Sequence, residues 1–198
     1  MATHQSTDSI YQLKITLVGS KPPIWRRVLV PASIKLSELH LVLQAIMNWE
    51  DYHLHMFSHN DTNYGAPLED DIDFGLQTVD EKKFKLEELL TEEGHKITYT
   101  YDFGDNWEHA VLLEKILPRE DDGIYPRVIK GKRQGPPEDC GGVWGYEEIL
   151  EAIASPKHPE HKTYLKWIGK DFNPEEFDLE TIQHRLTGTK PVKKTKKS

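Results

Sequence analysis

The residues best suited to chemistry gather in one short run, which extends from Tyr99 to His109 and reads YTYDFGDNWEH. Asp102 and Asp105 stand on either side of a glycine in this run, so carboxylate oxygens lie close together along a tight arc of backbone. Trp107 follows and is either a core anchor of the hairpin or an apolar wall for a ligand, and His109 shares its strand face with Trp107 and Val111, so we expect it to be largely buried. Such a run predicts a binding site, or a simple turn in which aspartates cap backbone amides.

A second polar run, GPPEDCGG, places Glu138, Asp139 and the lone cysteine, Cys140, next to paired glycines. Free glycine amides ahead of a helix suit an anion, or lower the pKa of a neighbouring thiol. A Cys140 nucleophile with His53 or His109 as its base is therefore one interpretation. The adjacent carboxylates would instead raise the thiol pKa, and a small buried cysteine is the other interpretation. The ligand-binding residues predicted from the two runs are Asp102, Asp105, Trp107, His109, Glu138, Asp139 and Cys140.

A His-x-His pair, His53 and His55, precedes these runs. On a strand both side chains point to one face, from which two imidazoles can reach a common metal ion. Carboxylates from elsewhere must complete the ligand set, so the predicted site for a divalent metal consists of His53, His55, Asp102 and Asp105. Two partly buried, hydrogen-bonded histidines are the alternative.

Apolar periodicity predicts the elements that must hold these residues in place. Alternation of apolar and polar residues predicts strands, and apolar residues at three- and four-residue steps predict helices. The predicted strands are 11–18, 24–30, 52–58, 96–103 and 107–117. The predicted helices are 36–48, 86–90, 146–153, 164–168 and 179–186, the last with Asp178 as its N-cap.

These elements favour an α+β domain on a mainly antiparallel sheet built from hairpins, because a doubly wound sheet needs regular alternation of strand and helix. We expect a flexible N-terminus over 1–10, a single domain over 11–186 and a basic disordered tail over 187–198. The polar segment 60–78 is expected to form a long loop of the kind that often serves binding. Arg26 and Arg27 point to opposite faces of their strand, so either one is buried against an acid or both are exposed.

Charge and composition narrow the class of protein. The chain has 25 basic and 33 acidic residues, and its last stretch, TGTKPVKKTKKS, holds five lysines and no acid. The remaining body carries a net charge of −13, from 20 basic and 33 acidic residues, and repels nucleic acid. Only the tail from Lys190 to Lys197 favours DNA. With one cysteine, no signal peptide and no membrane span in the sequence, we expect a cytoplasmic protein.

Four segments, YQLKITLVGSKPPIWRRVLVP, LHLVLQAIMNWEDYHLHMF, YTYDFGDNWEH and PPEDCGGVWGYEEIL, resemble the plasmid pRiA4b ORF-3-like family in order and spacing. The resemblance extends from Tyr11 to Asp178. It implies an α+β fold, an association with plasmids or transposons, and no settled activity. The residues shared with the family fall on Trp25, Arg26, His40, Trp49, His53, His55, Asp102, Gly104, Asp105, Trp107, His109, Pro137, Glu138, Asp139, Cys140 and Gly141.

The sequence leaves three functions open. The first is a binding domain for a protein or small-molecule ligand, with a cleft between the 102–109 hairpin, the His53 and His55 strand and the 138–142 loop. The second is a metal-dependent hydrolase or nuclease, in which His53, His55, Asp102, Asp105 and one of His109 and Asp139 hold an ion that activates water. The third is association with DNA through the lysine-rich tail.

Overall fold

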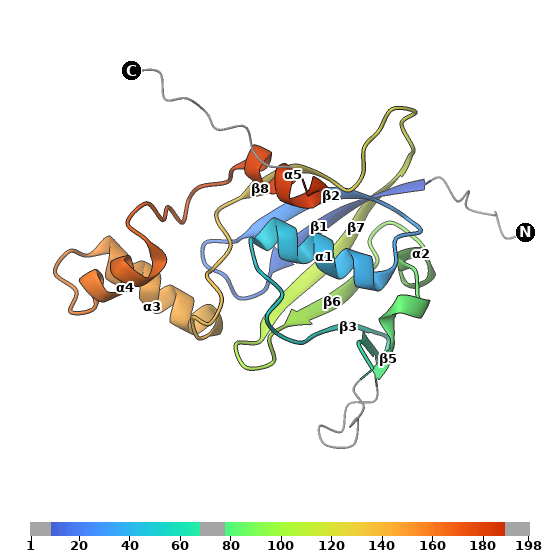
Figure 1. Ribbon diagram of the computed structural model, residues 1–198. Coiled ribbons are helices and arrows are strands. Elements are labelled where there is room, and N and C mark those ends of the chain that lie inside the picture. The colour runs from blue at the N-terminus through green and yellow to red at the C-terminus, as the bar shows by residue number, and fades with distance from the viewer. Residues whose placement is uncertain (1–8, 68–77, 189–198) are drawn as a thin grey trace, which may run out of the picture.

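The computed structural model describes residues 9–67 and 78–188. Within this part of the chain, eight strands form one sheet in the order β5-β4-β3-β6-β7-β1-β2-β8 (Figure 1). Every neighbouring pair is antiparallel except β4 and β5. The predicted α+β fold on a mainly antiparallel sheet is therefore confirmed.

The strands are β1 (Ser9–Leu17), β2 (Trp25–Pro31), β3 (His55–His59), β4 (Thr62–Gly65), β5 (Thr78–Asp80), β6 (Lys96–Tyr101), β7 (Trp107–Pro118) and β8 (Arg127–Lys132). The helices are α1 (Leu36–Met47), the short 3-10 helix η1 (Glu81–Lys83), α2 (Leu86–Leu89), α3 (Gly142–Ala154), α4 (His161–Ile168) and α5 (Leu179–Thr187). Asp178 caps α5 as predicted, because its carboxylate accepts a hydrogen bond from the Thr181 amide at 3.1 Å.

The centre of the sheet follows the alternation of the sequence. In β1 the side chains of Tyr11, Leu13, Ile15 and Leu17 are buried, whereas the residues between them are only half-buried. Ser9 and Ile10, which we assigned to the N-terminal segment, belong to this strand, since Ile10 pairs with Pro31 of β2. The strand therefore begins two residues earlier than predicted.

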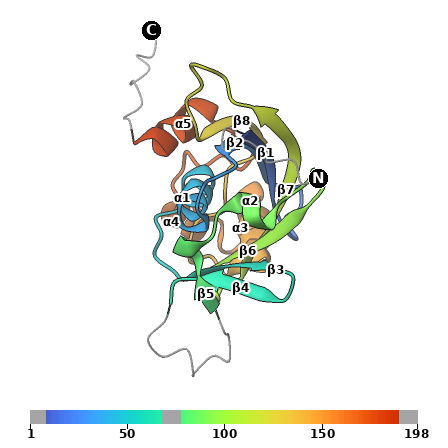
Figure 2. The ribbon, with the colours of Figure 1, turned by 90° about the vertical axis from the view of Figure 1, so that its right-hand side faces the viewer.

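Helix α1 supplies the second layer of the core. It lies across one face of the sheet with α5 beside it, whereas α3 and α4 stand beyond one end (Figures 1 and 2). Its predicted apolar stripe faces the sheet, because Leu36, Leu39, Leu43, Ile46 and Met47 are all buried. Burial of this stripe sets the rotation of α1 about its own axis. It also sets where the segment after α1 begins.

The strand predicted over 52–58 begins only at His55. Asp51 has a left-handed φ of 60°, and the amides of Tyr52 and His53 donate hydrogen bonds to the hydroxyl of Tyr101 rather than to a neighbouring strand. The Tyr101 side chain thus accepts the hydrogen bonds that a neighbouring strand would accept from Tyr52 and His53. His53 and His55 therefore do not lie on one regular strand.

Several further features were not predicted. Strands β4, β5 and β8 do not follow from the sequence pattern, and β4 and β5 lie at the two ends of the loop predicted over 60–78. Within that stretch, 68–77 lies outside the described residues, as does the tail from Lys190 to Lys197. No helix among the residues that the structure describes is long and apolar enough to cross a membrane.

Arg26 is buried, but not against an acid. Its Nε donates to the carbonyl of Ile46 at 2.8 Å, and its Nη1 donates to the carbonyls of Trp25 and Lys132, both at 2.9 Å. Burial lowers the pKa of its guanidinium to about 10. The arginine thus joins the end of α1 to β2 and β8, while Arg27 on the opposite face pairs with Glu114.

Candidate functional site

Three segments far apart in the sequence meet at one end of the sheet, and we call their meeting place the polar site. They are 49–54 after α1, the turn 102–106 between β6 and β7, and the loop 136–142 before α3. Trp49 Nε1 donates to the carbonyl of Pro136 at 2.9 Å, and the amide of Glu50 donates to Glu138 at the same distance. The segments are therefore fastened to one another by hydrogen bonds as well as by packing.

Asp102 holds the β6–β7 turn with one carboxylate oxygen and leaves the other free. Its Oδ1 accepts hydrogen bonds from the amides of Gly104 at 2.9 Å and Asp105 at 3.3 Å. Asp102 and Asn106 both have left-handed backbones, with φ of 56° and 54°, which aspartate and asparagine tolerate in turns. The conformational use predicted for the aspartate is thus realised by Oδ1, while Oδ2 faces the polar site.

Asp105 joins the turn to the 136–142 loop. Its Oδ2 accepts a hydrogen bond from the amide of Gly141 at 3.0 Å. Next to it, a Cβ on Gly142 would lie 2.3 Å from the carbonyl oxygen of Asp105, and Gly142 has a φ of 67°. Only glycine fits this close approach without strain. The carboxylate of Asp105 is therefore occupied in positioning the loop.

Tyr101 and Glu138 form a second link beneath the polar site. The Tyr101 hydroxyl donates a short hydrogen bond to Glu138 and accepts the amides of Tyr52 and His53. Burial, and then the neighbouring Glu138 carboxylate, raise the pKa of Tyr101, so the hydroxyl keeps its proton. This link holds the backbone on the N-terminal side of His53 in place.

His53 is the centre of the polar site. Its Nε2 lies 3.0 Å from Asp139 Oδ1 and 3.6 Å from Asp102 Oδ2. These three ligand atoms lie within 4.8 Å of one another. Nε2 is buried and, among the described residues, has no hydrogen-bond partner, because its short approach to Asp139 does not have the alignment of a hydrogen bond. The imidazole nitrogen thus faces two carboxylates without being satisfied by either.

The structure separates His55 from His53, contrary to the ligand set that we predicted. His55 Nε2 contacts Glu81 at 2.9 Å, and its ring stacks on His40 of α1 with ring centroids 3.5 Å apart. The two histidines separate because β3 begins only at His55. His53 lies before the strand, so the strand rule that places alternate side chains on one face does not apply to it. The predicted ligands therefore divide between two groups, and Asp105 belongs to neither.

Trp107 and His109 lie in the core beneath the polar site, since alternation along β7 turns both toward the buried face. Trp49 covers both, with ring centroids 5.8 Å from Trp107 and 5.4 Å from His109. Burial lowers the pKa of His109 to about 4, so its ring is neutral at pH 7. These two predicted ligand-binding residues support the site and do not line its surface.

Cys140 is partly buried beside the same loop and packs against the hydrophobic core. Burial, together with the carboxylates of Asp105 and Asp139, raises the pKa of its thiol to about 12. A thiol that remains protonated is a poor nucleophile. The packing role considered for the cysteine fits this environment, and the nucleophilic role does not.

Large apolar side chains that neighbour residues of the polar site in the sequence are exposed to solvent, and we call them the rim. Tyr52 and Leu54 flank His53 and are 74% and 48% exposed. Phe103 follows Asp102 and is 45% exposed, and Trp144, near the start of α3, is 82% exposed. The rim residues are Tyr52, Leu54, Phe103 and Trp144. Aromatic side chains left in water around a polar centre are typical of surfaces that contact a ligand.

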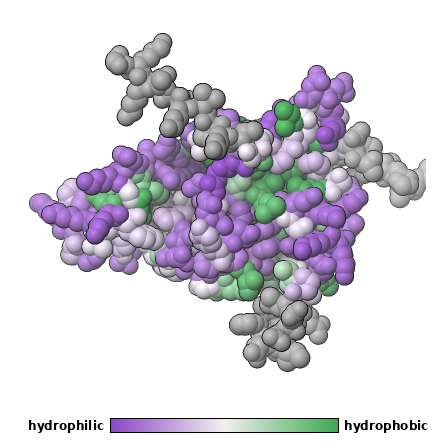
Figure 3. Space-filling model, viewed as in Figure 1, coloured by the Kyte–Doolittle hydropathy of each residue, from purple (hydrophilic) through white to green (hydrophobic). Residues whose placement is uncertain are grey.

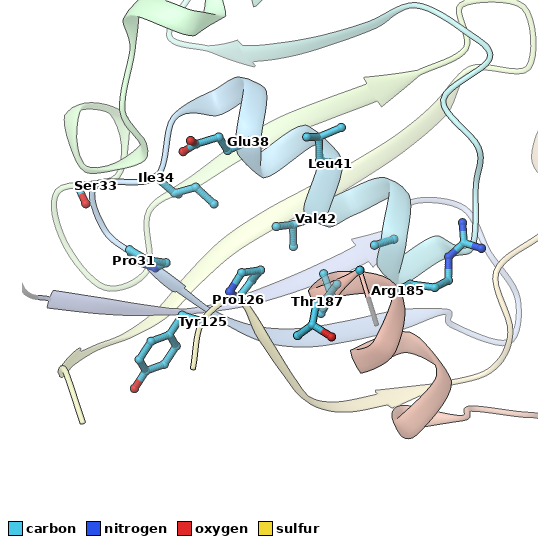
Figure 4. A pocket seen from close by; sticks show the side chains of 13 residues that line it. Pro31, Ser33, Ile34, Glu38, Leu41, Val42, Tyr125, Pro126, Arg185 and Thr187 are labelled. Atoms are coloured by element: carbon cyan, nitrogen blue, oxygen red, sulfur yellow. The ribbon is translucent and has the colours of Figure 1, made fainter. Parts of the chain in front are cut away.

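A separate apolar groove of about 640 Å³ lies between α1 and α5 (Figure 4). Val42, Pro126 and Thr187 gather at its centre, and Leu41 on its edge is 58% exposed. On the face of the molecule drawn in Figure 3, a hydrophobic area lies over α1 within a mostly hydrophilic surface. None of the residues that line this groove belongs to the polar site.

Sequence reasoning missed the partners of His55. His40 lies on α1 at a position that reads as part of an ordinary helix, and Glu81 lies on η1, which has no apolar period. The signal that was present is the family resemblance at His40, because strand alternation would place His53 and His55 on one face.

Comparisons with known proteins agree with the family resemblance. The family model described as plasmid pRiA4b ORF-3-like protein matches residues 9–181. An uncharacterised protein, y4hQ of Sinorhizobium fredii (strain NBRC 101917 / NGR234), is 40% identical over 163 residues, which cover 81% of each chain. The crystal structure of a protein of unknown function, MM3350 from Methanosarcina mazei Go1, is similar with a TM-score of 0.79 and 43% identity, covering 88% of this chain and 97% of that one.

Proposed function

Because this chain belongs to the plasmid pRiA4b ORF-3-like family, whose relatives named above have no stated activity, we propose its function from the polar site. The chain is a binding domain whose ligand site is centred on a divalent cation held by His53, Asp102 and Asp139. One observation carries this proposal: three ligand atoms from three separate segments lie within 4.8 Å of one another, and the imidazole nitrogen among them has no hydrogen bond within the described residues.

The charge of the surrounding chain supports a cation. The three segments of the polar site contain six acidic residues and no lysine or arginine, and Arg185 of α5 pairs with one of the six, Glu50, at 2.9 Å. Two carboxylates that face one imidazole repel each other, and a metal ion among them offsets this repulsion, as a proton on the imidazole also does. One nitrogen and two oxygen donors suit zinc and other first-row divalent ions better than calcium, which prefers more oxygen ligands.

The rim supports a ligand that reaches the cation from solvent. The Asp139 side chain is 66% exposed, so one side of the proposed ion remains open. A ligand that supplied the remaining coordination could lay its apolar parts on Tyr52, Phe103 and Trp144, and burial of such aromatic groups contributes most of the affinity at many interfaces. The polar centre would then set the position of the ligand, and the rim would stabilise it.

Zinc titration of the chelator-treated full chain by isothermal calorimetry tests the proposal. We expect His53→Ala and Asp139→Asn each to weaken zinc binding at this site at least about tenfold, because changes in residues that merely orient metal ligands already cost about 10- to 100-fold. The matched control is His59→Ala, a half-exposed histidine at the end of β3. Unchanged affinity in both variants would contradict the proposal.

A second candidate function is metal-dependent hydrolysis. The exposure of the Asp139 side chain favours it, because this leaves one side of the proposed ion open to solvent. Catalytic zinc ions have three protein ligands and keep one position for water. The high pKa of Cys140 removes the competing thiol mechanism. Zinc-dependent cleavage of an activated phosphodiester or amide, lost in His53→Ala and kept in His59→Ala, is the result that this function requires.

A further inference from the structure

A second group of metal-binding side chains lies beside the polar site and shares the segment 51–55 with it. It consists of His40 from α1, Asp51 from the turn after α1, and His55 from the start of β3. One ligand atom from each of the three lies within 4.8 Å of the other two. From this arrangement we propose that His40, Asp51 and His55 form a second divalent-cation site, with zinc as the expected type of ion. The proposal concerns different ligands from those of the proposed function and does not depend on it.

The surroundings of His55 match those of a metal-bound histidine. Glu81 is 3% exposed, and its Oε2 lies 2.9 Å from His55 Nε2. A buried carboxylate that accepts one ring N–H fixes the tautomer and leaves the other nitrogen, Nδ1, with a free lone pair. His55 Nδ1 forms no hydrogen bond with any residue that the structure describes. The pair of Glu81 and His55 is therefore arranged to present a nitrogen ligand.

His40 is oriented in the same manner from the opposite side. Its Nδ1 lies 2.8 Å from the hydroxyl of Tyr99, which also accepts a hydrogen bond from Gln44 at 3.0 Å. In the structure His40 Nε2 donates a hydrogen bond to Asp51 Oδ1 at 2.9 Å, because a carboxylate only accepts, and the Tyr99 hydroxyl donates to Nδ1. For Nε2 to bind an ion, the ring proton must move to Nδ1, which then donates to the Tyr99 hydroxyl. His40 is 4% exposed and the Asp51 side chain is 47% exposed, so an ion has a protein side and a solvent side.

The two imidazole rings are stacked, and binding of an ion requires a change in their orientation. The rings of His40 and His55 are 3.5 Å apart and only 4° from parallel. Lone pairs of two parallel rings do not meet at one point, so coordination of a single ion requires at least one ring to turn. The second site therefore has a signature of its own, which is a change in the environment of His40 and His55 when the ion binds.

The irregular backbone before β3 explains how one short segment serves both groups, because strand alternation would place Asp51, His53 and His55 on one face, and the strand begins only at His55. Asp51 and His55 turn toward His40, whereas His53 between them turns toward Asp102 and Asp139. The donor set of two imidazoles and one carboxylate favours zinc and neighbouring transition metals over magnesium or calcium. We therefore expect the full chain to hold two zinc ions at separate sites.

The test is the number of zinc ions bound per chain, measured by equilibrium dialysis and elemental analysis, in wild type and in three variants. Asp51→Asn removes the exposed ligand with little disturbance of the fold, and Asp61→Asn is the matched control, because both aspartates have a left-handed φ, of 60° and 61°. His53→Ala reports on the polar site alone. We expect two ions in wild type and in Asp61→Asn, and one ion in each of the other two variants.

The outcomes separate the two proposals. If wild type binds one ion that is lost in Asp51→Asn and kept in His53→Ala, the second site stands and the proposed function fails. If wild type binds one ion that is lost in His53→Ala and kept in Asp51→Asn, the second site is overturned. Loss of both ions in either variant would contradict two separate sites. Nuclear magnetic resonance of the imidazole rings supplies the structural check, because the signals of His40 and His55 must shift on zinc addition in the His53→Ala variant.

Discussion

His53 Nε2 lies 3.0 Å from Asp139 Oδ1, yet the two atoms do not form a hydrogen bond. Asp139 has a left-handed φ of 57°, and Asp102 on the other side of the imidazole has a φ of 56°. Aspartate tolerates this conformation in turns, so both backbones fit the local turns that place the two carboxylates beside the imidazole. The imidazole nitrogen and the two carboxylates are the three ligand atoms of the proposed cation site.

The Gly142→Ala substitution tests whether the contact between the 136–142 loop and the turn is as close as described. A Cβ there would lie 2.3 Å from the carbonyl oxygen of Asp105. Gly188→Ala is the control, since Gly188 has nearly the same φ, 66° against 67°, and nothing within 4 Å of its Cβ position. We expect both to lose about 1 kcal/mol of unfolding free energy from the left-handed backbone, and Gly142→Ala to lose more and to weaken zinc binding. Equal losses in thermal unfolding would show that the contact is not close.

The burial of His109 predicts that the free energy of unfolding falls as the solution is acidified. Its pKa in the folded chain is about 4, against an ordinary value of 6.5. The unfolded chain therefore binds more protons between these values, so this contribution to stability is fully present above pH 6.5 and is lost as the pH falls toward 4. It amounts to roughly 3 kcal/mol. In urea unfolding at pH 7 and pH 4.5, His109→Phe should lose less stability on acidification than wild type, whereas His59→Phe should not.

Arg26 should be far more important for stability than Arg27. Its three hydrogen bonds to carbonyls are worth roughly 5 kcal/mol together, because hydrogen bonds to charged groups contribute about 1.5–3 kcal/mol each. Burial of the cation offsets roughly 3 kcal/mol of that, from its lowered pKa. We expect Arg26→Met to cost about 2 kcal/mol and Arg27→Met at most about 1 kcal/mol, since the Arg27 pair with Glu114 is partly exposed. Equal losses in chemical denaturation would contradict the assignment.

The rim is expected to contribute to ligand binding and not to folding. Trp144 is 82% exposed, and Trp167 on α4, at 50% exposed, is a control on a different helix. Panning of a phage-displayed library of random peptides on the zinc-loaded chain should enrich peptides that place a metal-binding side chain beside an apolar one. Their binding should fall in Trp144→Ala and persist in Trp167→Ala, with unchanged unfolding temperatures. Equal binding by both variants would show that the rim is not a ligand surface.

The sequence predicted the elements whose pattern is local. The strands around Tyr11 and Val111, helix α1 and the cap at Asp178 follow from alternation, helical period and capping chemistry. It missed β8, whose place in the sheet comes from pairing with β2 across a distance of about 100 residues. It also misplaced the start of β3, because a tyrosine hydroxyl from another strand, that of Tyr101, takes the amides that a strand would use.

The sequence predicted which segments form the candidate site, but it predicted only some of the side chains that face one another there. The 102–106 turn, the 138–142 loop and His53 do meet, and Asp102 and Asp139 face His53. Periodicity predicted that His109 is buried, since it shares a face with Trp107 and Val111, and all three side chains are buried. No local sequence pattern could show that His55 contacts His40 and not His53, because His40 lies on a helix packed against the sheet.

Anomalous X-ray scattering at the zinc edge, from crystals grown with zinc, tests the central claim most directly. The account predicts a peak about 2.0–2.2 Å from His53 Nε2, Asp102 Oδ2 and Asp139 Oδ1, as zinc coordination requires. It also predicts loss of this peak, with the loop and turn unchanged, in crystals of the His53→Ala variant. An ordered His53 ring and no peak among these three atoms in wild-type crystals would contradict the account.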